Sequence, residues 1–182
     1  MNCPTHRCYC ASRAVGPWLG RDPSPWILRR ENGSGRVVRT CKTGMNISVA
    51  DLHQAFALIE CHKVIADFEG QKPEGLVSLA GAALGVRFPA SYRSFLMTYG
   101  CGNTGGQELF GVIKPDFKNS GIPDAIWLTL DEHQSSDLPE SFVIVYATGD
   151  GVYYAIDCAS TNEQSENSIF AWEPGSSKRG CA

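Results

Sequence analysis

The chain has 182 residues, a hydrophobic fraction of 43%, a charged fraction of 19% and a formal net charge of −3. These values are ordinary for a globular protein, and no apolar run approaches the roughly 20 residues that a membrane-spanning helix needs. Residues 9–20 are moderately apolar, but Arg13 and two glycines interrupt them, which makes a poor signal-peptide core. We therefore expect a cytoplasmic protein of one domain plus an appendage.

The charge is divided unevenly along the chain. Residues 1–44 hold eight Lys/Arg and two Asp/Glu, whereas residues 45–182 hold eight Lys/Arg and 17 Asp/Glu. The first segment also contains four prolines and shows no sustained hydrophobic period. We expect 1–44 to be a basic Cys/Pro/Gly-rich arm that is either disordered or translated from upstream of a true start at Met45, and 45–182 to be the folded domain.

Three helices are predicted at the start of this domain. The first covers about residues 49–66, with Ser48 and Asp51 as an N-terminal capping pair. The second covers 73–84 and stops at Gly85. Its predicted apolar face consists of Leu76, Leu79, Ala80, Ala83 and Leu84. The third covers 90–99, where Tyr92, Phe95, Leu96 and Tyr99 share one face.

Strand patterns follow the glycine-rich residues 100–106, which we interpret as a tight turn from helix to sheet. Residues 108–113, 142–147, 151–157 and 168–172 are predicted strands, and the Gly-Asp-Gly at 149–151 indicates a hairpin. The six-residue apolar run 125–130 fits either a strand or a short helix. Helices followed by strands predict an α+β fold, with N-terminal helices packed on a twisted antiparallel sheet of about four to five strands.

Residues 84–100, LGVRFPASYRSFLMTYG, contain the pattern L-G-x-x-x-P-x-x-Y-x-x-F-L-x-x-x-G. Together with FVIVYATGDGVYYAID and SIFAW further on, this pattern resembles the SUKH superfamily. That superfamily includes yeast cell-wall-synthesis regulators of the Smi/Knr type and many bacterial toxin-immunity proteins. The residues that carry the resemblance are Leu84, Gly85, Pro89, Tyr92, Phe95, Leu96, Gly100, Gly149, Asp150, Gly151, Tyr154, Asp157 and Trp172. The resemblance implies that they are mainly structural.

The resemblance implies a non-catalytic binding module rather than an enzyme. The leading interpretation is a bacterial immunity protein that neutralises a cognate toxin. The alternative is a regulatory scaffold that recruits a signalling or cell-wall-synthesis partner. Two departures from the family stand out: Gly81 occupies a position where a glutamate is common, and a further helix after the last strand is expected to be missing.

The eight cysteines do not form a convincing metal or disulfide framework. Cys3, Cys8 and Cys10 have the spacing C-x4-C-x-C, which does not match the usual paired zinc ligands even with His6 nearby. Without an export signal we expect reduced thiols, with Cys61 and Cys158 as small buried residues. Cys101 follows a helix C-terminus, which does not favour a thiolate, and is interpreted as a packed thiol.

No other pattern predicts catalysis or a cofactor. The glycines of 100–106 are not followed by the Lys-Ser/Thr of a phosphate-binding loop. Asp150 and Asp157 are interpreted as turn and loop residues rather than as an acid–base pair. The arginines of the arm lack interleaved aromatic residues, so direct binding of nucleic acid is not expected.

The acidic balance of 45–182 favours a basic partner, because a negative field speeds association with positive proteins. The alternative is that the acidic surface serves only solubility. Candidate partner-binding acids are Glu108, Asp116, Asp124, Asp131, Glu132, Asp137 and Glu140. Trp127 and Phe117 are candidate aromatic anchors, although Trp127 suits the core equally well. The expected partner is a basic toxin domain, such as a nuclease.

Overall fold

The computed structural model describes residues 26–30, 37–41, 49–161 and 166–175. The helices in these ranges are α1 (Val49–Cys61), η1 (Lys63–Ile65, a short 3-10 helix), α2 (Glu74–Leu84), α3 (Ala90–Tyr99) and α4 (Ala125–Ser135). The strands are β1 (Trp26–Arg30), β2 (Val37–Cys41), β3 (Ala66–Phe68), β4 (Gly102–Thr104), β5 (Gln107–Leu109), β6 (Phe142–Ala147), β7 (Tyr153–Thr161) and β8 (Asn167–Trp172).

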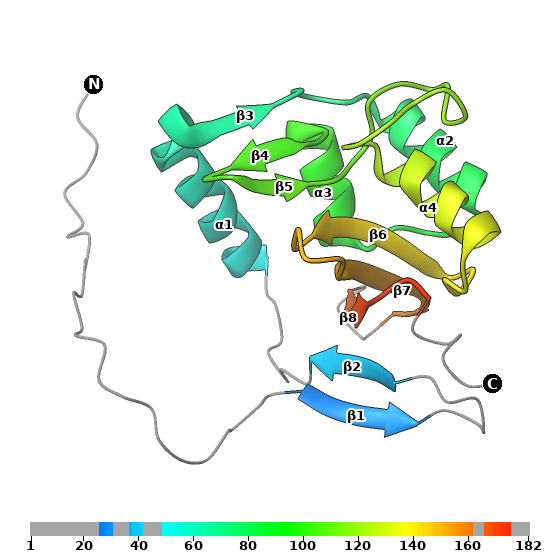
Figure 1. The fold of residues 1–182 in the computed structure, drawn as a ribbon. Helices are drawn as coiled ribbons and strands as arrows, with labels where there is room; N and C mark the ends of the chain where they lie inside the picture. Colours follow the sequence, from blue (N-terminus) through cyan, green and yellow to red (C-terminus); the bar gives the residue numbers. More distant parts are fainter. Residues whose placement is uncertain (1–25, 31–36, 42–48, 162–165, 176–182) are drawn as a thin grey trace, which may run out of the picture.

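All these strands join one antiparallel sheet, in the order β1-β2-β8-β7-β6-β5-β4-β3 (Figure 1). Strands β3 to β8 make a six-stranded sheet, and the β1–β2 hairpin extends it beyond β8. The α+β prediction is confirmed, with slightly more strands than the four to five expected. The two strands within residues 1–44 were not predicted. The rest of that arm lies outside the described residues, and its division from the domain stays a prediction.

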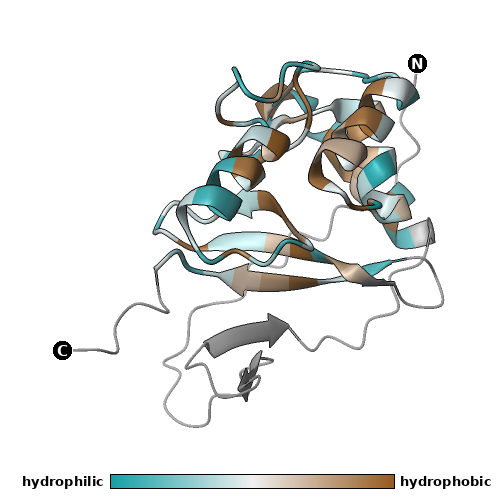
Figure 2. Cartoon of the chain, turned by 90° about the vertical axis from the view of Figure 1, so that its right-hand side faces the viewer, coloured by the Kyte–Doolittle hydropathy of each residue, from teal (hydrophilic) through white to brown (hydrophobic). Residues whose placement is uncertain are grey.

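Helices α2, α3 and α4 lie on one face of the sheet, and their apolar sides meet it (Figures 1 and 2). Leu96 of α3, Ile126 of α4 and Ile144 of β6 are fully buried in this layer. The Ile144 backbone N–H donates to the Thr129 hydroxyl at 3.1 Å, which fixes α4 against β6. Such a bond matters because an unpaired polar group in this layer would be costly.

Helix α3 matches its prediction in both bounds and buried face. Tyr92, Leu96 and Tyr99 are buried and Phe95 is half-buried, so the predicted face is confirmed. The buried Tyr92 hydroxyl donates to the Phe110 carbonyl at 3.0 Å. That bond connects the helix to the chain just after β5.

Helix α2 confirms three of the five residues predicted for its apolar face, because Ala80 and Leu84 are buried and Leu76 packs against the core. Val77, Ala80, Gly81 and Leu84 are buried, at i, i+3, i+4 and i+7, whereas Leu79 is half exposed. Ala83, also predicted inside, is exposed as well. A Cβ at Gly81 would lie 2.9 Å from the Val86 carbonyl oxygen, where the chain turns back after Gly85. The glutamate common in the family therefore cannot fit here without moving the backbone.

Helix α1 ends earlier than predicted, at Cys61 rather than near residue 66. The β-branched Val64 and Ile65 follow it, and residues 66–68 form β3 by pairing with β4. In this segment the helical spacing of apolar residues does not produce a helix, because the β-branched side chains favour an extended chain that pairs with β4. Cys61 is exposed, so its predicted burial was wrong. Ser48, the predicted cap, lies outside the described residues.

The glycine-rich residues 100–106 form more than a turn. They build most of the β4–β5 hairpin, whose tip is Gly105 and Gly106 at φ 58° and 80°. Two successive residues with positive φ suit a tight hairpin turn, and glycine adopts them without strain. The predicted strand 108–113 stops at Leu109, because the chain then leaves the sheet to approach α4.

The second half of the sheet agrees well with prediction. Strand β6 has the predicted bounds, and the hairpin after it is closed by a bond from the Thr148 N–H to the Val152 carbonyl. Gly149 and Gly151 have φ of 83° and 97°. Strand β7 runs on to Thr161, so Asp157 lies within the strand and not at its end.

Three glycines, Gly100, Gly102 and Gly111, allow the chain to cross itself in close contact, and we call this the glycine crossing. A Cβ at Gly111 would lie 1.7 Å from the Gly100 carbonyl oxygen, and one at Gly102 would lie 2.2 Å from the Asp67 carbonyl oxygen. A Cβ at Gly100 would meet the Gly70 carbonyl oxygen at 2.7 Å. No side chain fits at any of the three without moving backbone.

The glycine crossing generates a stability prediction. Gly111→Ala should lower the free energy of unfolding by about 2 kcal/mol or more, because its Cβ must displace rigid backbone. Urea unfolding followed by tryptophan fluorescence measures this. Gly121→Ala is the matched control, since a Cβ there has open space and the residue has no positive φ. Equal stability of the two variants would contradict the crossing.

Candidate functional site

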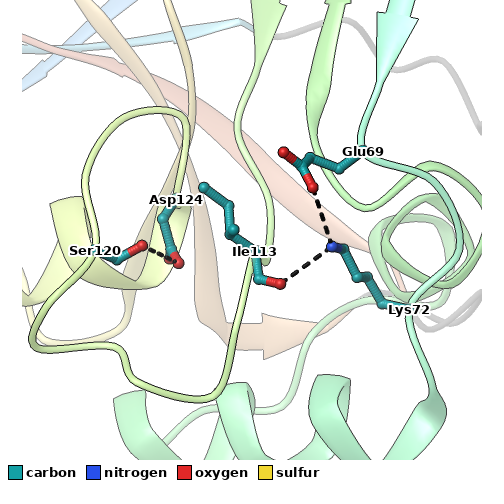
Figure 3. Close-up of polar contacts among 5 residues, drawn as sticks. All are labelled: Glu69, Lys72, Ile113, Ser120 and Asp124. Atoms are coloured by element: carbon teal, nitrogen blue, oxygen red, sulfur yellow. Dashed lines mark hydrogen bonds and ion pairs between the residues drawn. The ribbon is translucent and has the colours of Figure 1, made fainter.

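Helix α4 begins at a buried carboxylate. Asp124 is fully buried, and its Oδ1 accepts from the backbone N–H groups of Ile126 and Trp127 at 2.9 and 3.1 Å. The Ser120 hydroxyl donates to Oδ2 at 2.9 Å (Figure 3). Both oxygens therefore hold backbone or loop at the start of α4, a favourable place for a negative charge. Asp124 was predicted among the surface acids, and this was wrong.

A lysine lies close to this region and also holds backbone in place. Lys72 Nζ donates to the Ile113 carbonyl at 3.1 Å and lies 3.7 Å from a carboxylate oxygen of Glu69 (Figure 3). The Lys72 side chain is only 11% exposed. It connects the loop after β3 to the segment that leads from β5 toward α4. Its role is structural, like that of Asp124.

A cavity lies at the far end of α4. It measures about 290 Å³ and lies between the last turn of the helix and the residues that follow β8. It is lined by Glu132, Ser135, Ser136, Asp137, Pro174 and Gly175. Two predicted partner-binding acids, Glu132 and Asp137, thus come together here.

Two further acids lie close in the sequence to those that line the cavity, although neither lines it. Asp131 is exposed on α4, and Glu140 is exposed in the loop that follows the helix. The His133 ring nitrogen Nε2 lies 3.1 Å from the Pro139 carbonyl, which holds this loop against α4. We call Asp131, Glu132, Asp137 and Glu140 the acidic end of α4.

The backbone adds to the negative charge at the acidic end. The last carbonyls of a helix carry a partial negative charge, which attracts cations. Glu132 is held in position by the Ser136 hydroxyl, which donates to its Oε2 at 2.8 Å. Burial raises the pKa of Tyr153, and the nearby Glu132 charge raises that pKa further. The concave, acidic end of α4 is thus suited to a basic side chain.

The other predicted partner-binding residues lie elsewhere. Glu108 is on β5, opposite Asn103 of β4. Asp116 is exposed in the loop before α4, and the Asn119 side-chain hydrogen bond lowers its pKa. Trp127 is partly buried and packs against the core. Phe117 is only 7% exposed, so it belongs to the core and is not a surface anchor.

The second half of the resemblance motif lies along β7 and β8. Asp150 Oδ1 accepts from the Thr148 hydroxyl and the Val152 N–H within the hairpin turn, and these bonds lower its pKa. Asp157 accepts from the Ser141 hydroxyl and the Ala159 N–H, each at 2.9 Å. Asp150 therefore holds its own hairpin turn, whereas Asp157 bonds the residue before β6 and the backbone two residues further along β7.

The aromatic members of this half pack within the sheet. Trp172 is 4% exposed and stacks on Tyr153 with ring centres 5.9 Å apart. Tyr154 packs against Tyr146 across β6 and β7, with ring centres 5.7 Å apart. The aromatic spacing of this segment therefore serves cross-strand packing.

Two thiols in the described part of the chain, those of Cys101 and Cys158, are held in the protonated form. Cys101 is fully buried, and this desolvation raises its pKa to about 11. Burial likewise raises the pKa of the partly buried Cys158 to about 12. Within the described residues there is no group of three or more His, Cys, Asp or Glu that could hold a metal ion. No helix in the described part of the chain is long and apolar enough to cross a membrane.

The SUKH_6 family model, described as SMI1-KNR4 cell-wall, matches residues 74–180, which is more than half of the chain. The chain belongs to this SUKH family. The predicted resemblance is thereby confirmed, and the match runs from α2 through β8, including α4 and its acidic end. No curated protein matches the chain.

Sequence reasoning missed four of the six residues that line the cavity in this SUKH domain. Ser135 and Ser136 close α4, and Pro174 with Gly175 turns the chain after β8. The Pro-Gly pair is a turn signal in the sequence, but its position beside α4 depends on tertiary packing. The contact of Glu166 with Ser91 was missed for the same reason: its carboxylate accepts the Ser91 N–H at 2.8 Å across 75 residues of sequence.

The buried cap of α4 generates a second prediction. Asp124→Ala should lower the free energy of unfolding by about 2 kcal/mol, since the first-turn N–H groups and the Ser120 hydroxyl lose their acceptor. Asp124→Asn keeps one acceptor oxygen and should lose less. Denaturant unfolding measures both. Asp131→Ala, an exposed change on the same helix, is the control; a loss as large there would contradict the capping role.

A third prediction concerns thiol reactivity. With a pKa of about 11, Cys101 is ionised in only about one molecule in a thousand at pH 8. Iodoacetamide at pH 8 should therefore alkylate the exposed Cys61 and leave Cys101 unmodified until the chain is unfolded. Peptide mass spectrometry gives the two rates in one sample. Equal rates in the folded chain would show that Cys101 is accessible and ionised.

Proposed function

We propose that this chain is a non-catalytic binding module, an immunity protein that neutralises a cognate toxin. The membership of the SUKH family carries the proposal. The superfamily joins toxin-immunity proteins with regulators of the Smi/Knr type, and both groups act by binding other proteins.

The proposed contact surface is the acidic end of α4. It combines a cavity of about 290 Å³ with four carboxylates and the negative end of a helix. The partner that fits this chemistry is a basic protein domain, with an arginine or lysine entering the cavity. A nuclease toxin presents such a basic surface, because it must bind phosphates. The immunity protein would then block the groove that takes the nucleic acid.

The description of the matching family favours one second candidate. It names cell-wall proteins, so a scaffold that recruits a cell-wall-synthesis or signalling partner is the alternative. Both candidates are binding functions and differ in the partner.

Growth protection separates the two candidates. The full chain is used to capture partners from its source organism, and each captured protein is expressed in a host with and without the chain. A toxin that stops growth alone and is tolerated with the chain supports immunity. Capture of cell-wall-synthesis or signalling proteins, none of them toxic, would contradict immunity and support the scaffold function.

The electrostatic part of the proposal generates a fourth prediction. Asp131→Lys with Glu140→Lys should slow association with the captured toxin at least about tenfold at low salt, and this loss should shrink at high salt. Stopped-flow or surface-based kinetics measure the rate. The control reverses two exposed acids at the other end of the domain, Asp51→Lys with Asp67→Lys, which makes the same change in net charge. Equal slowing by both pairs would contradict a local contact at α4.

A further inference from the structure

The two edges of the six-stranded sheet β3–β8 are built differently. Strand β3 has three residues, and the exposed Asp67 lies in its middle. A short, charged edge strand resists pairing with another chain. Strand β8 has six residues, NSIFAW, with no charged residue and no proline. Nothing within β8 itself protects that edge.

The chain covers this unprotected edge with its own hairpin. Strand β2 pairs antiparallel with β8, with Arg39 opposite Ala171 and Thr40 opposite Phe170. Strand β1 pairs with β2 along five residues and becomes the new outer edge (Figure 1). The sequence of β1, WILRR, ends in two arginines, so the outer edge is now charged. The hairpin therefore replaces an uncharged edge by a basic one.

The cover on β8 is short compared with the other pairings of this strand. Two residue pairs join β2 to β8, whereas five pairs join β8 to β7 on its other side. The cover also differs in charge from the domain below it: residues 1–44 are net positive and residues 45–182 are net negative. The hairpin thus belongs to a basic segment and pairs with an acidic domain through only two residue pairs.

We propose that the outer edge of β8 is a strand-addition site, that the β1–β2 hairpin occupies it in the isolated chain, and that a basic extended strand of the partner displaces the hairpin. Backbone bonds to the β8 edge give such a strand its affinity, and charge attraction to the acidic domain favours a basic one. The inference rests on the proposed function only for the identity of the partner. The edge and its cover are properties of this chain alone.

The test compares two variants of the full chain. Adjacent residues in a strand direct their N–H groups to opposite neighbours, so Arg39→Pro with Thr40→Pro removes one donor toward β8 and one toward β1. Arg39→Ala with Thr40→Ala makes the same loss of charge and keeps both N–H groups. Hydrogen exchange of the β8 amides shows whether the hairpin is still paired with β8, because paired amides exchange slowly. The probe for the open edge is a synthetic peptide of residues 26–41.

In the double proline variant, the β8 amide hydrogens that face β2 should exchange at least tenfold faster than in the wild type and in the double alanine variant. This variant should also bind the peptide at least tenfold more tightly, and the bound peptide should restore slow exchange. A peptide with its four arginines changed to glutamate should bind at least tenfold more weakly. Equal binding of both peptides would overturn the preference for a basic strand.

Other outcomes would overturn the strand-addition site itself. Fast exchange of the edge-facing β8 amides in the wild type would show that the hairpin does not cover them, and this readout needs no variant. Dimerisation of the double proline variant without a gain in peptide binding would show that the edge accepts a second copy and not a basic strand. If the hydrogen-exchange and peptide results are as expected but the chain gives no growth protection, the strand-addition site stands and only the identification of the partner as a toxin is overturned.

Discussion

The glycine crossing is the constraint on which the rest of the structure depends. Three segments of the chain, at residues 67–70, 100–102 and 111, approach one another so closely that Gly100, Gly102 and Gly111 have no space for a Cβ. Backbone hydrogen bonds then fix the meeting: the Val112 N–H donates to the Gly100 carbonyl, and the Ala125 N–H donates to the Gly111 carbonyl at 2.7 Å. The end of α3, the chain after β5 and the start of α4 are thereby joined at one place. This contact fixes the start of α4 relative to the end of α3 and the chain after β5.

The position of α4 in turn brings the acidic end together. The Asp124 cap fixes the start of the helix, and the Thr129 hydroxyl bonds its middle to β6. Its last turn therefore meets the chain after β8, where Pro174 and Gly175 complete the cavity with Glu132 and Asp137. Buried polar groups in this molecule hold backbone in place. The position of the candidate binding surface therefore depends on these buried hydrogen bonds.

The sequence predicted what depends on local spacing and missed what depends on tertiary contact. Helix α3, strand β6 and the 149–151 hairpin follow from periodicity and turn chemistry, and all three were found with their bounds nearly unchanged. The buried face of α2 was predicted only in part, because Leu79 looks internal until the close approach at Gly81 is known. The acidic candidates shared only their charge in the sequence. Packing buried Asp124, separated Glu108 and joined Glu132 to Asp137.

The most direct test of the account is a map of the partner's footprint on the full chain. Amide chemical-shift changes recorded on titration with the captured partner would locate contacts residue by residue. The account predicts large changes at residues 131–140 and 174–175, where the carboxylates and the cavity lie, together with changes in β2 and β8 as the hairpin is displaced. Changes confined to α1 and β3, at the opposite end of the sheet, with none around α4, would contradict it.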